Sequence, residues 1–261
     1  MVHKKMVFHF WPNEGWEDNF ANKIHFKCLE HYSWIFDESL IVIAPDPGTE
    51  HLVPGVMKKF IDCVKSKTIT FKIVQNDAYF EGGTFKREII DKAGSTEGLV
   101  FFAHNKGVTC LSTQGKYDEK SLAIWICAMY FYNLEFYEEV EYKLCSTPAR
   151  TLSGAFLMGG QFIHNTAHVW FSGTIYWLNP GRIIKFSKNI PALQDREYAE
   201  WFPGEIFGED ITYTLATRSE LIIEDVNLYF AADGNYQAWG KTEEDTEKFK
   251  AFFKDINGYD L

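Results

Sequence analysis

The chain has 261 residues, enough for one large or two small domains, and its 46 % apolar residues supply a sizeable core. Aromatic residues make up 17 %, more than a core needs, which predicts that some line a cleft or an interaction face. A formal net charge of −10 argues against non-specific nucleic-acid binding, because that requires a basic surface. A small phosphorylated ligand, which needs one or two local cations, stays open.

The cysteines and the apolar runs bear on the cellular compartment. The five cysteines fit no zinc spacing, and their odd number favours reduced, mostly buried thiols. The apolar run near the N-terminus is too short for a signal peptide, and no run is long enough to span a bilayer. We therefore expect a soluble, cytoplasmic protein.

The first half of the chain alternates apolar runs with helical patterns. Strands are predicted at 6–10, 39–44, 68–74 and 98–103, with helices at 16–32, 56–64 and 84–93 between them. This alternation predicts a mostly parallel sheet flanked by helices, in which ligands bind beyond the carboxyl ends of the strands. The segments expected to meet at that rim are 11–15, 45–49, 75–83 and 104–107.

The second half has a different pattern. Residues 118–143 predict one long aromatic-rich helix, and short strands and loops follow it. A late strand pair is expected at 220–234, and residues 242–256 form an amphipathic helix with an acidic first turn. With no repeat or linker, the simplest interpretation is a single α/β domain over 1–261.

Polar residues end the strand at 98–103. His104, Asn105 and Lys106 follow it, and Gly107 permits close backbone approach to a ligand. These side chains suit anion capture, with Lys106 as the point charge; the alternative is an ordinary turn with a surface lysine. Neither G-x-G-x-x-G nor a P-loop is present.

The stretch "NDAYFEGGTF" follows the strand at 68–74. Asn76, Asp77 and Glu81 fall at the predicted rim, and a Gly-Gly pair opens the next helix. The alternative is turn chemistry without a ligand.

The stretch "FSGTIYWLNP" offers a second type of site. Ser172 and Gly173 precede a short aromatic strand, where Gly173 would let a ligand approach the backbone. Tyr176 and Trp177 would then stack on a sugar or base. The alternative is an edge strand closed by an Asn-Pro turn.

Carboxylates lie among aromatic residues in "DREYAEWFPGE". A carboxylate in apolar surroundings has a raised pKa and can act as a general base, which makes Asp195, Glu200 and Glu205 candidates. The alternative is a solvated acidic face. His164 and His168 have the spacing of a metal pair, but the residues between them favour no helix and no HExxH motif is present.

The order of these segments resembles bacterial glycosyltransferases of polysaccharide biosynthesis with a GT-A-like fold, including rhamnan-synthesis-type proteins and other sugar transferases. The matching segments are Asn76 to Glu81, His104 to Gly107, Ser172 to Trp177 and Arg196 to Trp201, and the resemblance spans roughly 6–210. It implies a nucleotide-binding half at 1–110 and an acceptor-side half at 111–261.

The resemblance also implies roles for these residues. The donor would contact Asn76, Asp77, Glu81, His104, Asn105 and Lys106, and the acceptor Ser172, Gly173, Tyr176 and Trp177. Glu200 would be the catalytic base, with Asp195 and Glu205 in reserve. In such enzymes the strand at this point usually ends in Asp-x-Asp, which holds a divalent metal. Because His104-Asn105-Lys106 stands in that place, we expect metal-independent or weakly metal-dependent transfer.

The function expected from the sequence is sugar transfer from a nucleotide-sugar donor to a surface polysaccharide or glycolipid, without nucleic acid and with peripheral membrane association left open. The first alternative is a non-catalytic nucleotide-sugar or carbohydrate-binding protein on the same fold. The second is a metal-dependent hydrolase that uses His104, His164 and His168.

Overall fold

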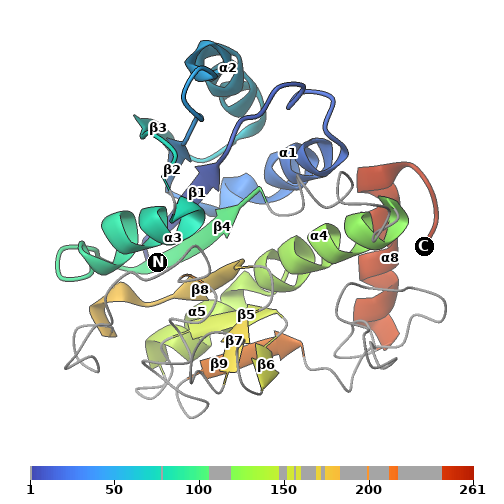
Figure 1. Ribbon diagram of the computed structural model, residues 1–261. Coiled ribbons are helices and arrows are strands. Elements are labelled where there is room, and N and C mark those ends of the chain that lie inside the picture. The colour runs from blue at the N-terminus through green and yellow to red at the C-terminus, as the bar shows by residue number, and fades with distance from the viewer. Residues whose placement is uncertain are drawn as a thin grey trace.

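The computed structural model is an α/β structure built on a seven-stranded mixed sheet (Figure 1). It describes residues 2–77, 79–105, 119–146, 152–155, 157–159, 169–171, 174–182, 199, 212–216 and 243–261. The strand order is β3-β2-β1-β4-β8-β5-β9. The strands are β1 (Lys4–Phe10), β2 (Glu38–Ile43), β3 (Thr68–Ile73), β4 (Leu99–His104), β8 (Tyr176–Leu178), β5 (Leu152–Ala155) and β9 (Thr212–Ala216).

The first four strands form the parallel part of this sheet. β1 pairs in parallel with β2 on one side and β4 on the other, and β2 pairs in parallel with β3. β8 is antiparallel to both of its neighbours, β4 and β5, while β5 is parallel to β9. A separate antiparallel pair joins β6 (Leu157–Gly159) to β7 (Val169–Phe171). The predicted α/β class with a mostly parallel sheet is confirmed.

Helices cover both faces of the parallel strands. The bounds are α1 (Phe20–Tyr32), α2 (Val53–Cys63), α3 (Phe80–Phe85), α4 (Glu119–Leu134), α5 (Tyr137–Ser146) and α8 (Glu243–Asn257), with short turns at Ser33–Ile35 and Glu50–Leu52 and a π-helical turn at Lys86–Ile90. Met6 and Phe8 of β1 pack into one core cluster with α1, α2, α4 and α8. Val7 points to the opposite face and packs with α3 and the π-helical turn. β1 is therefore buried on both sides, as a central parallel strand requires.

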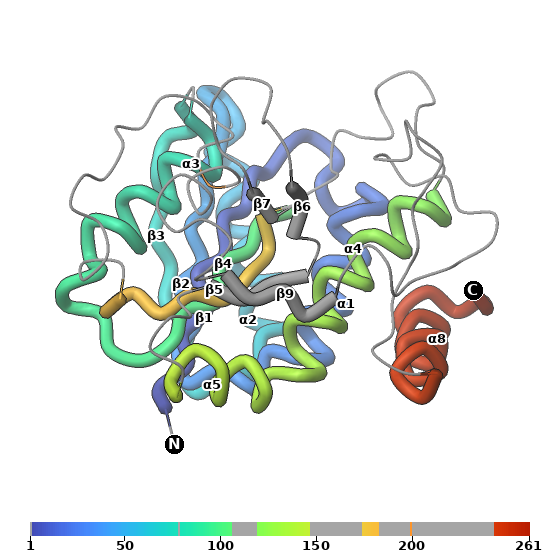
Figure 2. The backbone as a smooth tube through the Cα atoms, turned by 90° about the horizontal axis from the view of Figure 1, so that it is seen from below, coloured from blue at the N-terminus to red at the C-terminus, as the bar shows by residue number. Residues whose placement is uncertain are grey.

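Two helix predictions need correction. The helix expected at 16–32 begins only at Phe20, because Asn19 caps it by accepting a hydrogen bond from the backbone N–H of Asn22 at 3.1 Å. The helix expected at 118–143 is two helices, and Figure 2 shows that α4 and α5 run in different directions. Residues 121–134 are all buried, whereas α5 buries only Val140 and Leu144, so the change of direction carries the chain from the core to the surface.

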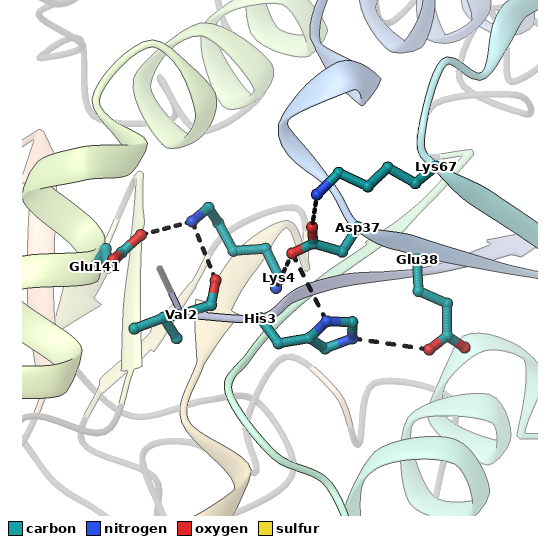
Figure 3. A network of polar contacts seen from close by, with 7 residues as sticks. All are labelled: Val2, His3, Lys4, Asp37, Glu38, Lys67 and Glu141. Carbon is teal, nitrogen blue, oxygen red and sulfur yellow. Dashed lines mark hydrogen bonds and ion pairs between the residues drawn. The ribbon is translucent and has the colours of Figure 1, made fainter.

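The amino ends of the strands are held by an ion-pair network (Figure 3). Asp37 accepts a hydrogen bond from the backbone N–H of Lys4 at 3.0 Å and pairs with the Lys67 Nζ at 2.5 Å. The Lys4 Nζ lies 2.6 Å from the Glu141 Oε2. The hydrogen bonds from Lys67 and Lys4 hold the pKa of Asp37 below its usual value. The charged groups at this end are thus engaged with one another.

No helix in the described part of the chain has the length and apolar character needed to cross a membrane.

Candidate functional site

The candidate site lies at the carboxyl ends of β1 and β4. The chain moves from β1 outward to β2 and β3, and then returns to place β4 on the other side of β1. Doubly wound sheets bind ligands at such a reversal of strand order, beyond the carboxyl ends of the strands. Contacts among the segments that follow β1, β2, β3 and β4 confirm the prediction that they meet at one rim.

Asp46 joins three of these segments. Its Oδ2 accepts a hydrogen bond from the Trp11 Nε1 at 2.9 Å, and its Oδ1 accepts one from the Asn76 Nδ2 at 2.8 Å. Since a carboxylate only accepts, this contact fixes the amide orientation of Asn76. The Asn76 Oδ1 is then a buried oxygen without a hydrogen-bond partner among the described residues. The Asn76 Oδ1 is thus an acceptor whose hydrogen bond is still to be supplied, beside the half-buried indole of Trp11.

Sequence reasoning missed Trp11 and Asp46. Both follow a predicted strand directly, Asp46 within the turn-forming stretch Pro-Asp-Pro-Gly. Their position at the rim was the available signal, because any polar or aromatic residue one or two places beyond a parallel strand falls there.

Asn105 has a structural role. Its Oδ1 accepts a hydrogen bond from the backbone N–H of Trp11 at 3.1 Å, and its Nδ2 donates to the Trp11 carbonyl at 3.0 Å and to the Asn22 Oδ1 at 3.2 Å. The residue is only 4 % exposed. This buried amide clamps the segment after β1, so we assign Asn105 a structural role, and its predicted donor-binding role stays untested.

His9 and His104 are partners in register on the neighbouring strands β1 and β4. The His9 Nδ1 lies 2.9 Å from the Thr84 Oγ1, and the His104 Nδ1 lies 3.8 Å from the Glu81 Oε1. Burial lowers the pKa of His9 to about 4; the nearby Glu81 and Asp77 charges oppose that shift, and His104 and Arg87 add to it. His9 is therefore neutral near pH 7, and its buried Nε2 has no hydrogen-bond partner in the described part of the chain.

The segment between β3 and α3 brings further charges to this end of the sheet. The Asp77 Oδ1 accepts a hydrogen bond from the backbone N–H of Tyr79 at 2.8 Å, and its Oδ2 lies 3.2 Å from the Arg87 Nη1. Phe80 has a φ of 43°, which is strained for a bulky side chain, and its ring meets that of Trp11 edge-on, with 6.2 Å between the ring centroids. The predicted site residues Asn76, Asp77, Glu81 and His104 thus lie on segments that meet at the carboxyl end of the sheet.

Tyr176 and Trp177 lie in the core. Neither side chain has exposed surface; the Tyr176 hydroxyl donates to the Ala199 carbonyl at 2.8 Å and the Trp177 Nε1 to the Asn133 carbonyl at 2.8 Å. The prediction that they stack on an acceptor is wrong. The physical reason is that both faces of β8 are covered: Trp177 packs into the core cluster that includes α4, and Tyr176 packs on the opposite face against α3 and the π-helical turn.

The remaining predicted site residues lie outside the described residues. They are Lys106, Ser172, Gly173, Asp195, Glu200 and Glu205. Within the described ranges, no group of three His, Cys, Asp or Glu side chains is arranged to hold a metal ion.

Comparison with known proteins adds no relative: no family model matches the chain, and no curated protein matches it.

Proposed function

We propose that the chain is a GT-A-like glycosyltransferase that moves a sugar from a nucleotide-sugar donor to a saccharide or glycolipid acceptor. The proposal rests on one observation: two sets of side chains meet at the carboxyl ends of β1 and β4, where the strand order reverses. Trp11, Asp46 and Asn76 stand beyond β1, β2 and β3, while His9 and His104 stand on β1 and β4. This point of a parallel sheet is the usual place for a nucleotide.

The first set suits a nucleoside. The half-buried indole of Trp11 offers a face on which a base can stack, and its N–H is already held by Asp46. The Asn76 Oδ1, unpaired among the described residues, can accept a hydrogen bond from a base N–H. Asp46 holds the Trp11 indole and the Asn76 amide in place before the ligand binds. This preorganisation lowers the entropy cost of binding.

The second set suits the reacting end of the donor. The Glu81 carboxylate can accept hydrogen bonds from sugar hydroxyls, and the neutral His9 ring has one nitrogen that donates and one that accepts. In this proposal Lys106 follows β4 and faces the diphosphate, and Glu200 is the catalytic base, with Asp195 and Glu205 as the other candidates. Ser172 and Gly173 keep their proposed place beside the acceptor.

A thermal-shift screen against UDP-, GDP-, CMP- and dTDP-sugars tests the proposal. We expect one nucleotide class to raise the melting temperature, and Asn76→Leu to reduce that shift. Asn257→Leu is the matched control, because the Asn257 amide donates to the Phe253 carbonyl in α8, away from the candidate site. A wild-type protein unaffected by all four classes would contradict the proposal.

Slow donor hydrolysis without acceptor separates an enzyme from a binding protein. A transferase slowly transfers the sugar of its donor to water, whereas a binding protein releases the donor unchanged. Tight donor binding without hydrolysis, and without transfer to any offered saccharide, would favour the non-catalytic alternative on the same fold.

Activity should persist in EDTA if the site neutralises the leaving diphosphate with protein cations. The measurement is transfer, or donor hydrolysis, before and after chelation. Complete loss that manganese or magnesium restores would show that the reaction needs a divalent metal.

A further inference from the structure

We infer that Arg87 binds the diphosphate of the donor, and that Asp77 holds its guanidinium when the ligand is absent. The inference rests on the proposed function and deepens it, since it names a second cation, besides Lys106, for the anionic part of the substrate. Arg87 belongs to the π-helical turn after α3, and sequence reasoning did not single it out.

The ion pair between Arg87 and Asp77 can be replaced by a pair between Arg87 and a ligand phosphate. The Arg87 Nη1 lies 3.2 Å from the Asp77 Oδ2, and the two side chains are 38 % and 40 % exposed. An ion pair this exposed contributes little to folding, so its loss is readily offset by a stronger anion. A planar guanidinium presents paired donors that match two phosphate oxygens better than one carboxylate oxygen at this distance.

Gly83 allows the guanidinium to fold back over α3. A Cβ at position 83 would lie 3.0 Å from the Arg87 Nη1 and 3.1 Å from its Nη2. An alanine there would require the end of the Arg87 side chain to shift by a few tenths of an ångström. The buried Gly83 therefore leaves space for the position in which Arg87 meets Asp77.

A second observation points to a ligand at the same place. The His9 Nε2 is buried without a hydrogen-bond partner among the residues that the structure describes, and His9 as a whole is 2 % exposed. The His9 Nδ1 lies 2.9 Å from the Thr84 Oγ1, and Thr84 follows Gly83, the residue over which the Arg87 guanidinium folds. An orphaned ring nitrogen close to an exchangeable ion pair is explained by a site that the ligand completes.

Calorimetric titration with inorganic pyrophosphate tests the inference on the full chain. We expect Arg87→Gln to raise the Kd at least about tenfold, and Arg87→Lys to raise it less. Gly83→Ala should also weaken binding. Asp77→Asn should lower the Kd, because it removes the carboxylate that competes with the phosphate.

Two variants that break other ion pairs of the chain serve as controls. Lys67→Gln breaks the pair with Asp37 at the amino end of the sheet, and Asp91→Asn breaks the pair with Lys86 at the far end of the π-helical turn. Both should leave the Kd unchanged. If Arg87→Gln fails to fold, Arg87→Lys and Asp77→Asn still decide the question.

The opposite outcomes overturn the inference. An unchanged Kd in Arg87→Gln would remove Arg87 from the site, and a Kd raised by Asp77→Asn would show that Asp77 itself contacts the ligand. Pyrophosphate binding that depends on Arg87, without binding of any nucleotide sugar, would support the inference and contradict the proposed function. Nucleotide-sugar binding that is indifferent to Arg87 would do the reverse. A wild-type protein that binds neither ligand contradicts both.

Discussion

His9 couples the candidate site to the stability of the fold. Burial depresses its pKa to about 4 from an ordinary value of 6.5, so the unfolded chain binds more protons than the folded chain between these two values. The contribution of His9 to the free energy of unfolding is therefore fully present above pH 6.5. It decreases as the pH falls from 6.5 toward 4. The loss between pH 7 and pH 5 amounts to about 2 kcal/mol, at roughly 1.4 kcal/mol per pH unit below 6.5.

We predict that His9→Gln removes that part of the pH dependence. Glutamine keeps an amide for the contact with Thr84 but does not titrate in this range. The measurement is urea unfolding at pH 7 and pH 5 for both proteins. His51→Gln is the same substitution at an exposed position and serves as the control. Parallel pH profiles for wild type and His9→Gln would show that His9 is accessible to protons in the folded state.

Asn105→Ala should destabilise the fold by about 2–3 kcal/mol, because it leaves buried polar groups of Trp11 and Asn22 without their partner. Urea unfolding gives this number. Nucleotide-sugar affinity, measured where the variant is fully folded, should fall little. A variant of normal stability that has lost affinity would place Asn105 among the donor-binding residues.

Position at a rim can be predicted from sequence, but the direction of a side chain cannot. His104 and Asn105 are adjacent and come directly after the apolar run that ends at Ala103, so the sequence places both at the rim. His104 lies near Glu81, whereas Asn105 turns inward to clamp the segment after β1. The partners of Asn105 are 83 and 94 residues away in sequence, so no local pattern identifies them.

At the scale of the elements, the start of β4 depends on Gly98. Gly98 has a φ of +82°, and a Cβ there would lie 2.1 Å from the His3 carbonyl oxygen, which accepts the backbone N–H of Leu99. We predict that Gly98→Ala costs at least about 2 kcal/mol, because it combines an unfavourable φ with a backbone clash.

Gly48→Ala separates the two causes. Gly48 has a φ of +93°, but a Cβ at this position would have no atom of the described residues within 4 Å. Only the conformational cost of about 1 kcal/mol therefore applies. Denaturant unfolding of both variants gives the comparison. Equal losses would mean that the backbone at Gly98 relaxes away from His3.

The elements that sequence predicted well are those with local signals. The four parallel strands and the helices between them follow from the alternation of apolar runs with four-residue repeats. The strand at Tyr176 was predicted, but its insertion between β4 and β5 was not, because pairing depends on segments far apart in the chain. Tyr176 and Trp177 are buried because elements from distant parts of the chain cover both faces of this strand.

On the scale of the whole molecule, the two ends of the parallel strands differ. At the amino end, Lys4, Asp37, Lys67 and Glu141 satisfy one another (Figure 3). At the carboxyl end, the His9 Nε2 and the Asn76 Oδ1 are buried without partners among the described residues. The Ser39 Oγ near the start of β2 is also buried without a partner among the described residues, so the orphaned groups alone do not separate the two ends. The reversal of strand order at the carboxyl ends of β1 and β4 is what favours that end for a ligand.

Hydrogen exchange of the backbone amides, with and without the nucleotide sugar that most raises the melting temperature, tests this central claim most directly. We predict ligand-induced protection at 11–16, 45–49 and 75–87 and none at 34–38 or 137–146. Protection confined to the amino end of the strands, or absent from the carboxyl end, would contradict the account.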